Sequence, residues 1–534
     1  MLTSYILITL IAAFGHSEDF LGTTLLSRPL VLGPLVGLVL GDFEQGIVIG
    51  ATLELIFMGN IKVGAAIPPD VITGGVLGTA FAIMSGKGPA VALALAVPIS
   101  ILAEMVVSGL FVFRPVWNKR FDRYAEDGDY RSVERLHILS GLLKPLLMGV
   151  VTLLALLLGS DAVRSFVDTI PPWVHSGLQV AGNMLPALGF ALLMNLMFNK
   201  EGAPYFFLGF ILTSYLKLPM IAIGGLGVII ALIVTNITHK EQPAAHSDGD
   251  FDDFDMDDSP PVMVKPKSSL LTQGDIRSLF VRSMALEANF NFETWQNTGF
   301  AFTMIPVLKR LYKTKEAMSG ALKRHLQFFN TAPHGSTLII GIAAAMEEQN
   351  AREHDFDEES INSVKTGLMG PLAGVFDSLF WGTIKVIAAG IGTSLALQGS
   401  ALGPLLFLVI FNVPHLILRY KLTFVGYETG TRFLQDLSKT NVMDKLKAGS
   451  AILGLMVVGA MPATLMAIKT PAMIGSSDSA VPLQGVLDQI VPHIIPLALT
   501  FLVFYFVKRN VKTTYLLLGL LLLGFLGSVL NIFA

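Results

Sequence analysis

The chain has 534 residues, of which 52% are hydrophobic and 14% charged, and its mean hydropathy is +0.64. Soluble globular domains carry charge on about a quarter of their residues, so this composition excludes a soluble fold. The net charge of −3 excludes a nucleic-acid partner, because no basic field attracts phosphates, and the absence of cysteine excludes disulfides and thiol catalysis.

Residues 1–113 are rich in glycine and poor in charge. The start of the chain lacks a basic leader and a small-residue cleavage site, so we expect a retained segment. Apolar runs near 2–15, 29–41, 45–67 and 74–113 are interrupted often by Gly and Pro. Interrupted backbone at membrane depth predicts broken or re-entrant helices that lie inside the protein or beside water.

The segment from Gln45 to Asp70 combines this apolar, broken sequence with four polar side chains, Glu54, Asn60, Lys62 and Asp70. Ionisable groups are costly at the bilayer centre, so they survive where they line a cavity or pair with each other. Discontinuous helices of this kind build midplane substrate sites in many transporters. We therefore predict a solute pathway, with a structural Glu54–Lys62 pair as the alternative.

Spanning-length apolar runs follow a basic stretch, 114–144, that we expect in the cytoplasm. The predicted spans are Leu142–Gly159, Gly177–Phe198, Leu218–Thr235, Ala448–Ile468, Ile490–Val507 and Thr514–Phe533, with a shorter one at Tyr205–Leu216. Alternation of these spans with basic loops places the C-terminus outside.

Residues 241–269 form the clearest boundary, with seven Asp between positions 248 and 258, followed by three prolines. Like charges repel and little apolar surface is available for burial, which predicts a disordered acidic linker in the cytoplasm.

The second half opens with a basic, amphipathic stretch in which Thr272 to Asp275 resembles a helix start. Two clusters carry chemistry. His325 and Asn330 surround a pair of phenylalanines in RHLQFFNTAPHGS, which suits a sugar ring with an apolar face and a polar rim; an interfacial helix end that caps itself is the alternative. Asp377 lies in the apolar run MGPLAGVFDSLFWGT and needs a ligand or a partner.

Catalytic and nucleotide-binding motifs are missing from the sequence: it has no P-loop and no HExxH pair, and its ten histidines are scattered. We expect no catalytic residue, metal or cofactor in this chain.

The sequence that contains these residues resembles a known protein family. Residues 1–240 resemble the IIC membrane subunit of mannose-family sugar phosphotransferase permeases, through Arg28-Pro29, LGDFEQGIVIGATLELIFMG and VGAAIPPD. Residues 270–534 resemble the IID subunit, through LTQGDIRSLFVRS, RHLQFFNTAPH and GLMGPLAGVFDSLFWGT. These subunits are usually separate chains, so the sequence resembles a natural IIC–IID fusion.

The resemblance implies an all-α polytopic protein of the bacterial cytoplasmic membrane, with two membrane domains joined by the linker. It implies a homotrimer that binds a hexose or hexose derivative outside and presents it inward to a IIB protein, which receives its phosphoryl group from phosphoenolpyruvate through IIA. By position, it implies that Glu54, Asp70, His325, Asn330 and Asp377 contact the sugar. Lys62 stands where a neutral polar residue is expected, which extends the expected substrates to charged or amino sugars.

Two other functions stay open at this point. One is an ion-coupled secondary transporter with Glu54 and Asp377 as coupling carboxylates, and the other is a surface receptor or scaffold. Uptake that requires phosphoenolpyruvate and yields sugar phosphate distinguishes the phosphotransferase permease from both.

Overall fold

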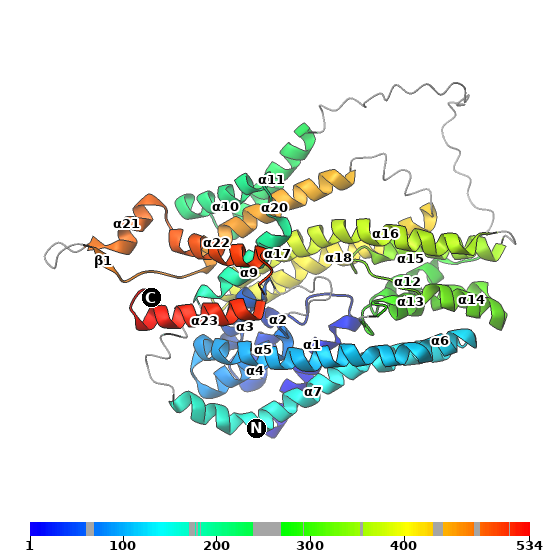
Figure 1. Ribbon diagram of the computed structural model, residues 1–534, viewed down its shortest axis with the longest axis horizontal. Coiled ribbons are helices and arrows are strands. Elements are labelled where there is room, and N and C mark those ends of the chain that lie inside the picture. The colour runs from blue at the N-terminus through cyan, green and yellow to red at the C-terminus, as the bar shows by residue number, and fades with distance from the viewer. Residues whose placement is uncertain are drawn as a thin grey trace.

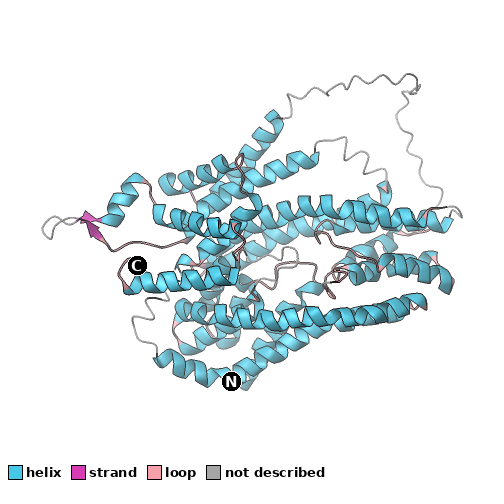
Figure 2. Ribbon diagram, in the orientation of Figure 1, coloured by secondary structure: helices cyan, strands magenta, loops and turns pink. Residues whose placement is uncertain are grey.

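A computed structural model describes the chain except for residues 60–68, 170–176, 178–179, 182, 239–268, 292, 353–355, 431–441, 475–480, 512 and 534. The described chain is mostly helical (Figure 2). A short antiparallel pair, β1 (Met473–Ile474) and β2 (Val481–Pro482), departs from the predicted all-α class. The helical membrane fold is confirmed at this level. Asn60, Lys62 and all of the predicted linker except Ser269 lie outside the described residues.

The first half contains the helices α1 (Leu2–His16), η1 (Ser17–Phe20), α2 (Pro29–Leu40), α3 (Phe43–Phe57), α4 (Val71–Ser85), α5 (Gly88–Phe113), η2 (Arg114–Trp117), α6 (Asn118–Glu126), α7 (Tyr130–Thr169), α9 (Pro186–Met197), α10 (Ala203–Leu216) and α11 (Met220–Thr238). The second half contains α12 (Gln273–Ser283), α13 (Asn297–Leu311), α14 (Lys315–His325), α15 (Ser336–Arg352), α16 (Glu358–Leu379), the π-helix η3 (Phe380–Ile384), α17 (Lys385–Ala396), α18 (Leu402–Thr429), α20 (Val442–Leu465), α21 (Leu483–Ile490), α22 (Ile494–Lys508) and α23 (Thr513–Val529).

Four helical segments of the described chain are long and apolar enough to cross a membrane: Gly88–Glu126, Tyr130–Gly159, Glu358–Ala396 and Leu402–Glu428. A fifth arises if α21 and α22, bent by 78° at their junction, form one broken span. The predicted span Leu142–Gly159 lies within the second of these. α11 (Met220–Thr238) covers most of the predicted span 218–235, and α20 (Val442–Leu465) covers most of the predicted span 448–468. The predicted span 514–533 ends four residues beyond α23, and the predicted span 177–198 contains α9 but also includes residues outside the described part of the chain.

Small residues allow two helices of the first half to pack with their backbones in contact. Arg28 precedes the N1 proline of α2, and Gly41 ends this helix in the left-handed conformation. A Cβ atom on Gly33 would lie 2.7 Å from the Gly46 carbonyl oxygen, and one on Gly46 would lie 2.6 Å from the Gly33 carbonyl oxygen. The α2–α3 hairpin therefore requires glycine at both positions.

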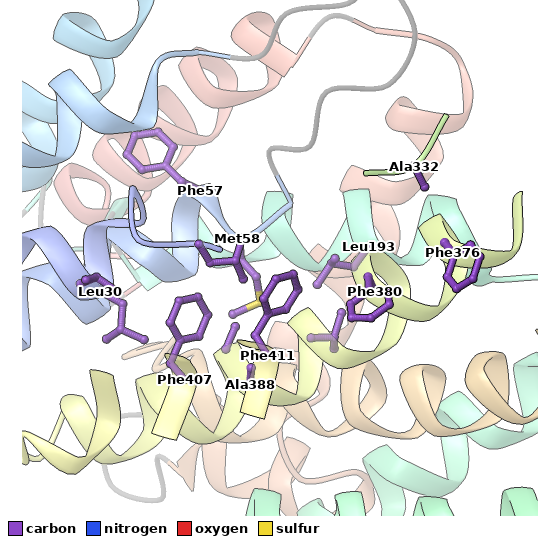
Figure 3. Packing of buried hydrophobic residues seen from close by; sticks show 14 of the residues in the cluster. Leu30, Phe57, Met58, Leu193, Ala332, Phe376, Phe380, Ala388, Phe407 and Phe411 are labelled. Atoms are coloured by element: carbon purple, nitrogen blue, oxygen red, sulfur yellow. The ribbon is translucent and has the colours of Figure 1, made fainter. Parts of the chain in front are cut away.

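The two halves interleave. α10 of the first half packs against α20 of the second, α9 against α22 and α3 against α17. One buried apolar cluster runs through both halves, and Figure 3 shows Met58 of the first half among Phe407, Phe411 and Ala388 of the second. The halves thus share a core.

The molecule is elongated along its helices (Figure 1). α6 and α14 lie at one end, and the C-terminus, β1 and α21 lie at the other. The basic helix α6 and the C-terminal region thus lie at opposite ends of the molecule in this view. The predicted helix start at Thr272 is confirmed as a capping box in which Thr272 and Asp275 bond reciprocally.

Candidate functional site

Glu54 is fully buried in α3, where Arg28 from the start of α2 holds its carboxylate. Arg28 Nε donates to the two Glu54 oxygens at 2.9 and 3.1 Å, and Arg28 Nη2 lies 2.8 Å from Oε1. Nη2 also donates to the Phe57 carbonyl oxygen at 2.6 Å. In the described residues the partner of Glu54 is Arg28, and the sequence analysis missed it. The sequence did contain a signal for this pair, because Arg28 adjoins an apolar stretch and a buried arginine needs a partner.

Lys385 brings a third charge to this pair from the second half. It lies at the start of α17, is 1% exposed, and interacts electrostatically with Arg28 and Glu54. Its Nζ lies 5.1 Å from the centre of the Trp381 ring, within cation–π range. The buried charges of α2, α3 and α17 therefore meet where the two halves join.

Asp70 is the N-cap of α4. Its carboxylate accepts from the Thr73 backbone N–H at 3.1 Å and lies 3.5 Å from His16 Nε2. Its own N–H donates to the Ser100 carbonyl oxygen at 2.9 Å. The Asp70 side chain is 10% exposed.

His325 belongs to a separate buried network at the end of α14. Its Nε2 lies 2.9 Å from Glu347 Oε1, and Arg324 holds the same carboxylate through Nε and Nη2 at 2.8 and 3.1 Å. Burial lowers the pKa of His325 to about 4. Burial opposes ionisation of Glu347, but hydrogen bonds and charge from His325 and Arg324 outweigh it and lower its pKa to about 2. This arrangement holds α14 on α15.

Asp377 lies exposed on α16, inside a segment long enough to span the membrane. The indole of Trp381, one turn later, hydrogen-bonds its carboxylate, and Glu287 faces it electrostatically. Gly367, Gly370 and Gly374 line the same exposed side of α16, and a Cβ at any of them would meet no atom within 4 Å. Among the described residues, the helix face next to this carboxylate is therefore open at the three glycines.

An aromatic group of the second half surrounds Trp381. His334 is fully buried and stacks on Phe380 at 4.2 Å, with Trp381, Phe411 and His415 packed against its edges. Phe380 and Trp381 open the π-helix η3, an irregularity found often at functional sites. Asn330 is half-buried nearby in sequence, and its backbone N–H faces the Met369 sulfur at 3.5 Å.

The loop from Ser17 to Arg28 joins this region to the first half. The Thr23 hydroxyl donates to Glu287 at 2.8 Å. Arg419 donates to the Gly22 carbonyl oxygen at 3.1 Å, and Asn412 donates to that of Thr24 at 2.8 Å. The structure therefore links Glu54, through Arg28, and Asp377, through Glu287, to this loop at the boundary between the halves, and places His325 in a separate network.

No group of three or more His, Cys, Asp or Glu side chains in the described residues could hold a metal ion. What these residues offer a ligand is one exposed carboxylate beside an indole, supported by buried ion pairs.

Two sequence families match the chain. Residues 2–233 match the family described as PTS system sorbose-specific IIC component, and residues 270–533 match PTS system mannose/fructose/sorbose family IID component. The mannose-specific EIID component of Escherichia coli (strain K12) is 39% identical over 48% of the chain and 93% of its own length. The sorbose-specific EIIC component of Klebsiella pneumoniae is 33% identical over 44% of the chain and 89% of its own length. A chain of a solved mannose transporter ManYZ–microcin E492 complex is 38% identical, covers 49% of this chain and 98% of its own length, and gives a TM-score of 0.30.

Proposed function

Because this chain belongs to the mannose/fructose/sorbose family of phosphotransferase-system membrane components, with a IIC and a IID component in one polypeptide, we propose that it carries a hexose or hexose derivative across the bacterial cytoplasmic membrane. A separate IIB protein phosphorylates the sugar at the inner face, with the phosphoryl group supplied through IIA. The chain itself binds and reorients sugar, and we expect the phosphoryl-carrying residues on the IIA and IIB proteins.

The observation that carries this proposal is the exposed carboxylate of Asp377 beside Trp381 on the glycine-lined face of α16. A carboxylate at membrane depth needs hydrogen-bond donors, and the hydroxyl rim of a sugar supplies several. An indole offers the apolar face on which the C–H side of a sugar packs.

The six predicted site residues then take two roles. Asp70, Asn330 and Asp377 are the proposed direct contacts, because each has side-chain surface left over, and Asn60 is proposed with them from its sequence position alone. Glu54 is fully buried in an ion pair with Arg28, and His325 is fully buried against Glu347, so we propose that they support the site by fixing α2–α3 and α14–α15.

A homotrimer embedded in lipid is the proposed assembly. α18 keeps an exposed apolar stripe of helical period, formed by Leu402, Leu405, Val409, Val413 and Ile417. Such a stripe suits either acyl chains or another copy of the chain.

Sugar binding to the purified protein tests the proposal. Asp377→Asn keeps shape but removes a charged acceptor worth roughly 1.5–3 kcal/mol, so we expect the sugar Kd to rise about ten- to hundredfold while the melting temperature stays unchanged. Glu359→Gln, at an exposed site in the first turn of the same helix, is the matched control. Unchanged affinity in Asp377→Asn would remove Asp377 from the site, and uptake that survives loss of IIB but collapses with an ionophore would refute the phosphotransferase role.

A further inference from the structure

Arg114 lies at the junction of α5 and η2 with no exposed surface, yet most of its guanidinium makes no hydrogen bond to a described residue. Nη1 donates to the Phe290 carbonyl oxygen at 2.9 Å. Nε and Nη2 find no hydrogen-bond partner among the described residues. These two nitrogens form the edge that presents two parallel N–H groups, the geometry that matches a carboxylate or a phosphate.

The other buried arginines of the described chain use this edge. Arg28 and Arg324 each place Nε and Nη2 on a carboxylate, of Glu54 and Glu347 respectively. Arg419 places Nε on the Ser283 hydroxyl at 3.2 Å and Nη2 on the Ser283 carbonyl oxygen. Among the buried arginines of the described chain, Arg114 therefore differs from the other three in leaving this edge without a hydrogen-bond partner.

Residues near Arg114 and Phe290 along the chain also carry buried polar atoms without a described partner. Asn289 and Asn291 flank Phe290, whose carbonyl binds Arg114, and Asn289 Oδ1 and Asn291 Nδ2 are buried without a partner among the described residues. On the first-half side, Trp117 Nε1 is another buried donor without a described partner. A buried donor or acceptor without a partner is costly, and a ligand that binds Arg114 could also satisfy these atoms.

The local charge is positive. Arg114 and Lys144 both lie against the Phe111 ring, at 5.1 and 5.9 Å. Asp19 interacts electrostatically with Arg114, and its carboxylate is bound to Lys144 at 2.8 Å. The contacts described here therefore bring two cations and one carboxylate together.

We propose that Arg114, with Asn291 and Trp117, forms a binding site for a phosphate-type oxyanion in the seam between the two halves, with Asn289 accepting from a protonated ligand oxygen. The ligand is inorganic phosphate, a soluble phosphate monoester or a phospholipid headgroup, which share the oxyanion that two parallel N–H groups bind. The site goes beyond the proposed sugar path, since none of its residues contributes there. Phosphate binding needs neither sugar nor IIB, so either proposal can fail alone.

Equilibrium dialysis of the purified full chain with labelled inorganic phosphate, at constant ionic strength in chloride, tests the site. Wild type should bind saturably. Arg114→Lys keeps the charge but loses the two-donor edge, so we expect its phosphate Kd to rise about ten- to hundredfold. Arg277→Lys, at an exposed position of α12, should bind as wild type does. Asn289→Asp, which adds a repelling charge to the seam without a change of shape, should lose binding to a similar extent and serves if Arg114→Lys fails to fold.

Competition identifies the source of the oxyanion. Displacement of labelled phosphate by a hexose 6-phosphate supports a soluble ester, and displacement by nanodiscs that contain phosphatidylglycerol supports a lipid headgroup. Absence of saturable binding in wild type, or equal binding in wild type and both folded variants, would overturn the proposal.

Discussion

Arg28 and Glu54 form a buried ion pair in which both carboxylate oxygens are hydrogen-bonded. Both carboxylate oxygens and the Phe57 carbonyl are bound by one guanidinium. Replacing a buried pair by apolar groups is often neutral, whereas removing one partner leaves an uncompensated charge that costs about 3–5 kcal/mol.

Glu54→Gln should therefore lower the thermal stability of the purified protein strongly, because it leaves the Arg28 charge buried without its counter-charge. The double change Arg28→Met with Glu54→Leu should recover most of that loss. Glu44→Gln, exposed in the first turn of α3, serves as the control. A Glu54→Gln protein that melts normally but binds sugar weakly would instead make Glu54 a direct sugar contact.

Titration of Glu18 makes the folding stability of the protein depend on pH. Its carboxylate accepts from the Leu25 and Ser27 backbone N–H groups, with Asp19 and Arg28 nearby. Burial raises its pKa from 4.5 to about 7, against the opposing effect of the two hydrogen bonds. Between these values the folded protein keeps a proton that the unfolded chain releases, so this group makes stability fall as pH rises.

Glu18→Gln removes that titration. Its melting temperature relative to wild type should rise as pH increases from about 4.5 to 7 and then level off. Asp19→Asn is the comparison at the adjacent position. A difference between Glu18→Gln and wild type that does not vary over this pH range would contradict the prediction.

The sequence located Asp70 and Asp377 as costly charges in apolar surroundings but could not identify what binds them. The Asp70 cap needs only Thr73, three residues away. Arg28, Lys385 and Glu287 escaped notice because their partners lie 26 or more residues away or in the other half. Periodicity and local cost find a charged residue, whereas its partner is fixed by tertiary packing.

At the scale of elements, the α2–α3 hairpin depends on glycine where backbones meet. Gly33→Ala would place a methyl group 2.7 Å from the Gly46 carbonyl oxygen and from Gly50 Cα. Overpacking of this kind costs about 1–3 kcal/mol, so we expect a lower melting temperature and less folded protein in membranes. Gly109→Ala in α5, where a Cβ meets nothing within 4 Å, should be tolerated; equal effects of the two substitutions would show that the hairpin does not limit stability.

Helices with a local sequence signal were predicted, whereas a membrane helix that contains charged residues was missed. The capping box at Thr272 was readable because its signal is local. α18 was not recognised as a span because Arg419 and Lys421 interrupt its apolar sequence; in the structure Arg419 is fully buried and bonded to Ser283 and Gly22. A charge that a distant partner neutralises does not end a membrane helix.

At the scale of the whole molecule, the two halves hold each other through non-covalent contacts. The α10–α20 packing and the bonds from Thr23 to Glu287 and from Arg419 to Gly22 all cross between them. A chain cut between residues 241 and 269, with both pieces expressed together, should copurify from membranes and transport sugar nearly as the intact chain does, since a tether only raises effective concentration. Pieces that separate during purification would assign the linker a structural role.

The α10–α20 contact also has a consequence for synthesis. Phe206 of α10 meets Gly459 of α20 so closely that a Cβ there would clash with its backbone. At 5–20 residues per second, the ribosome makes α20 roughly ten to fifty seconds after α10. During that interval the newly synthesised first half lies in the bilayer with the α20-binding surface of α10 uncovered. Chaperones, proteases and incorrect partner proteins can then reach this surface. Joining both halves in one polypeptide ensures that the correct partner follows each first half, in equal number and at the same insertion site.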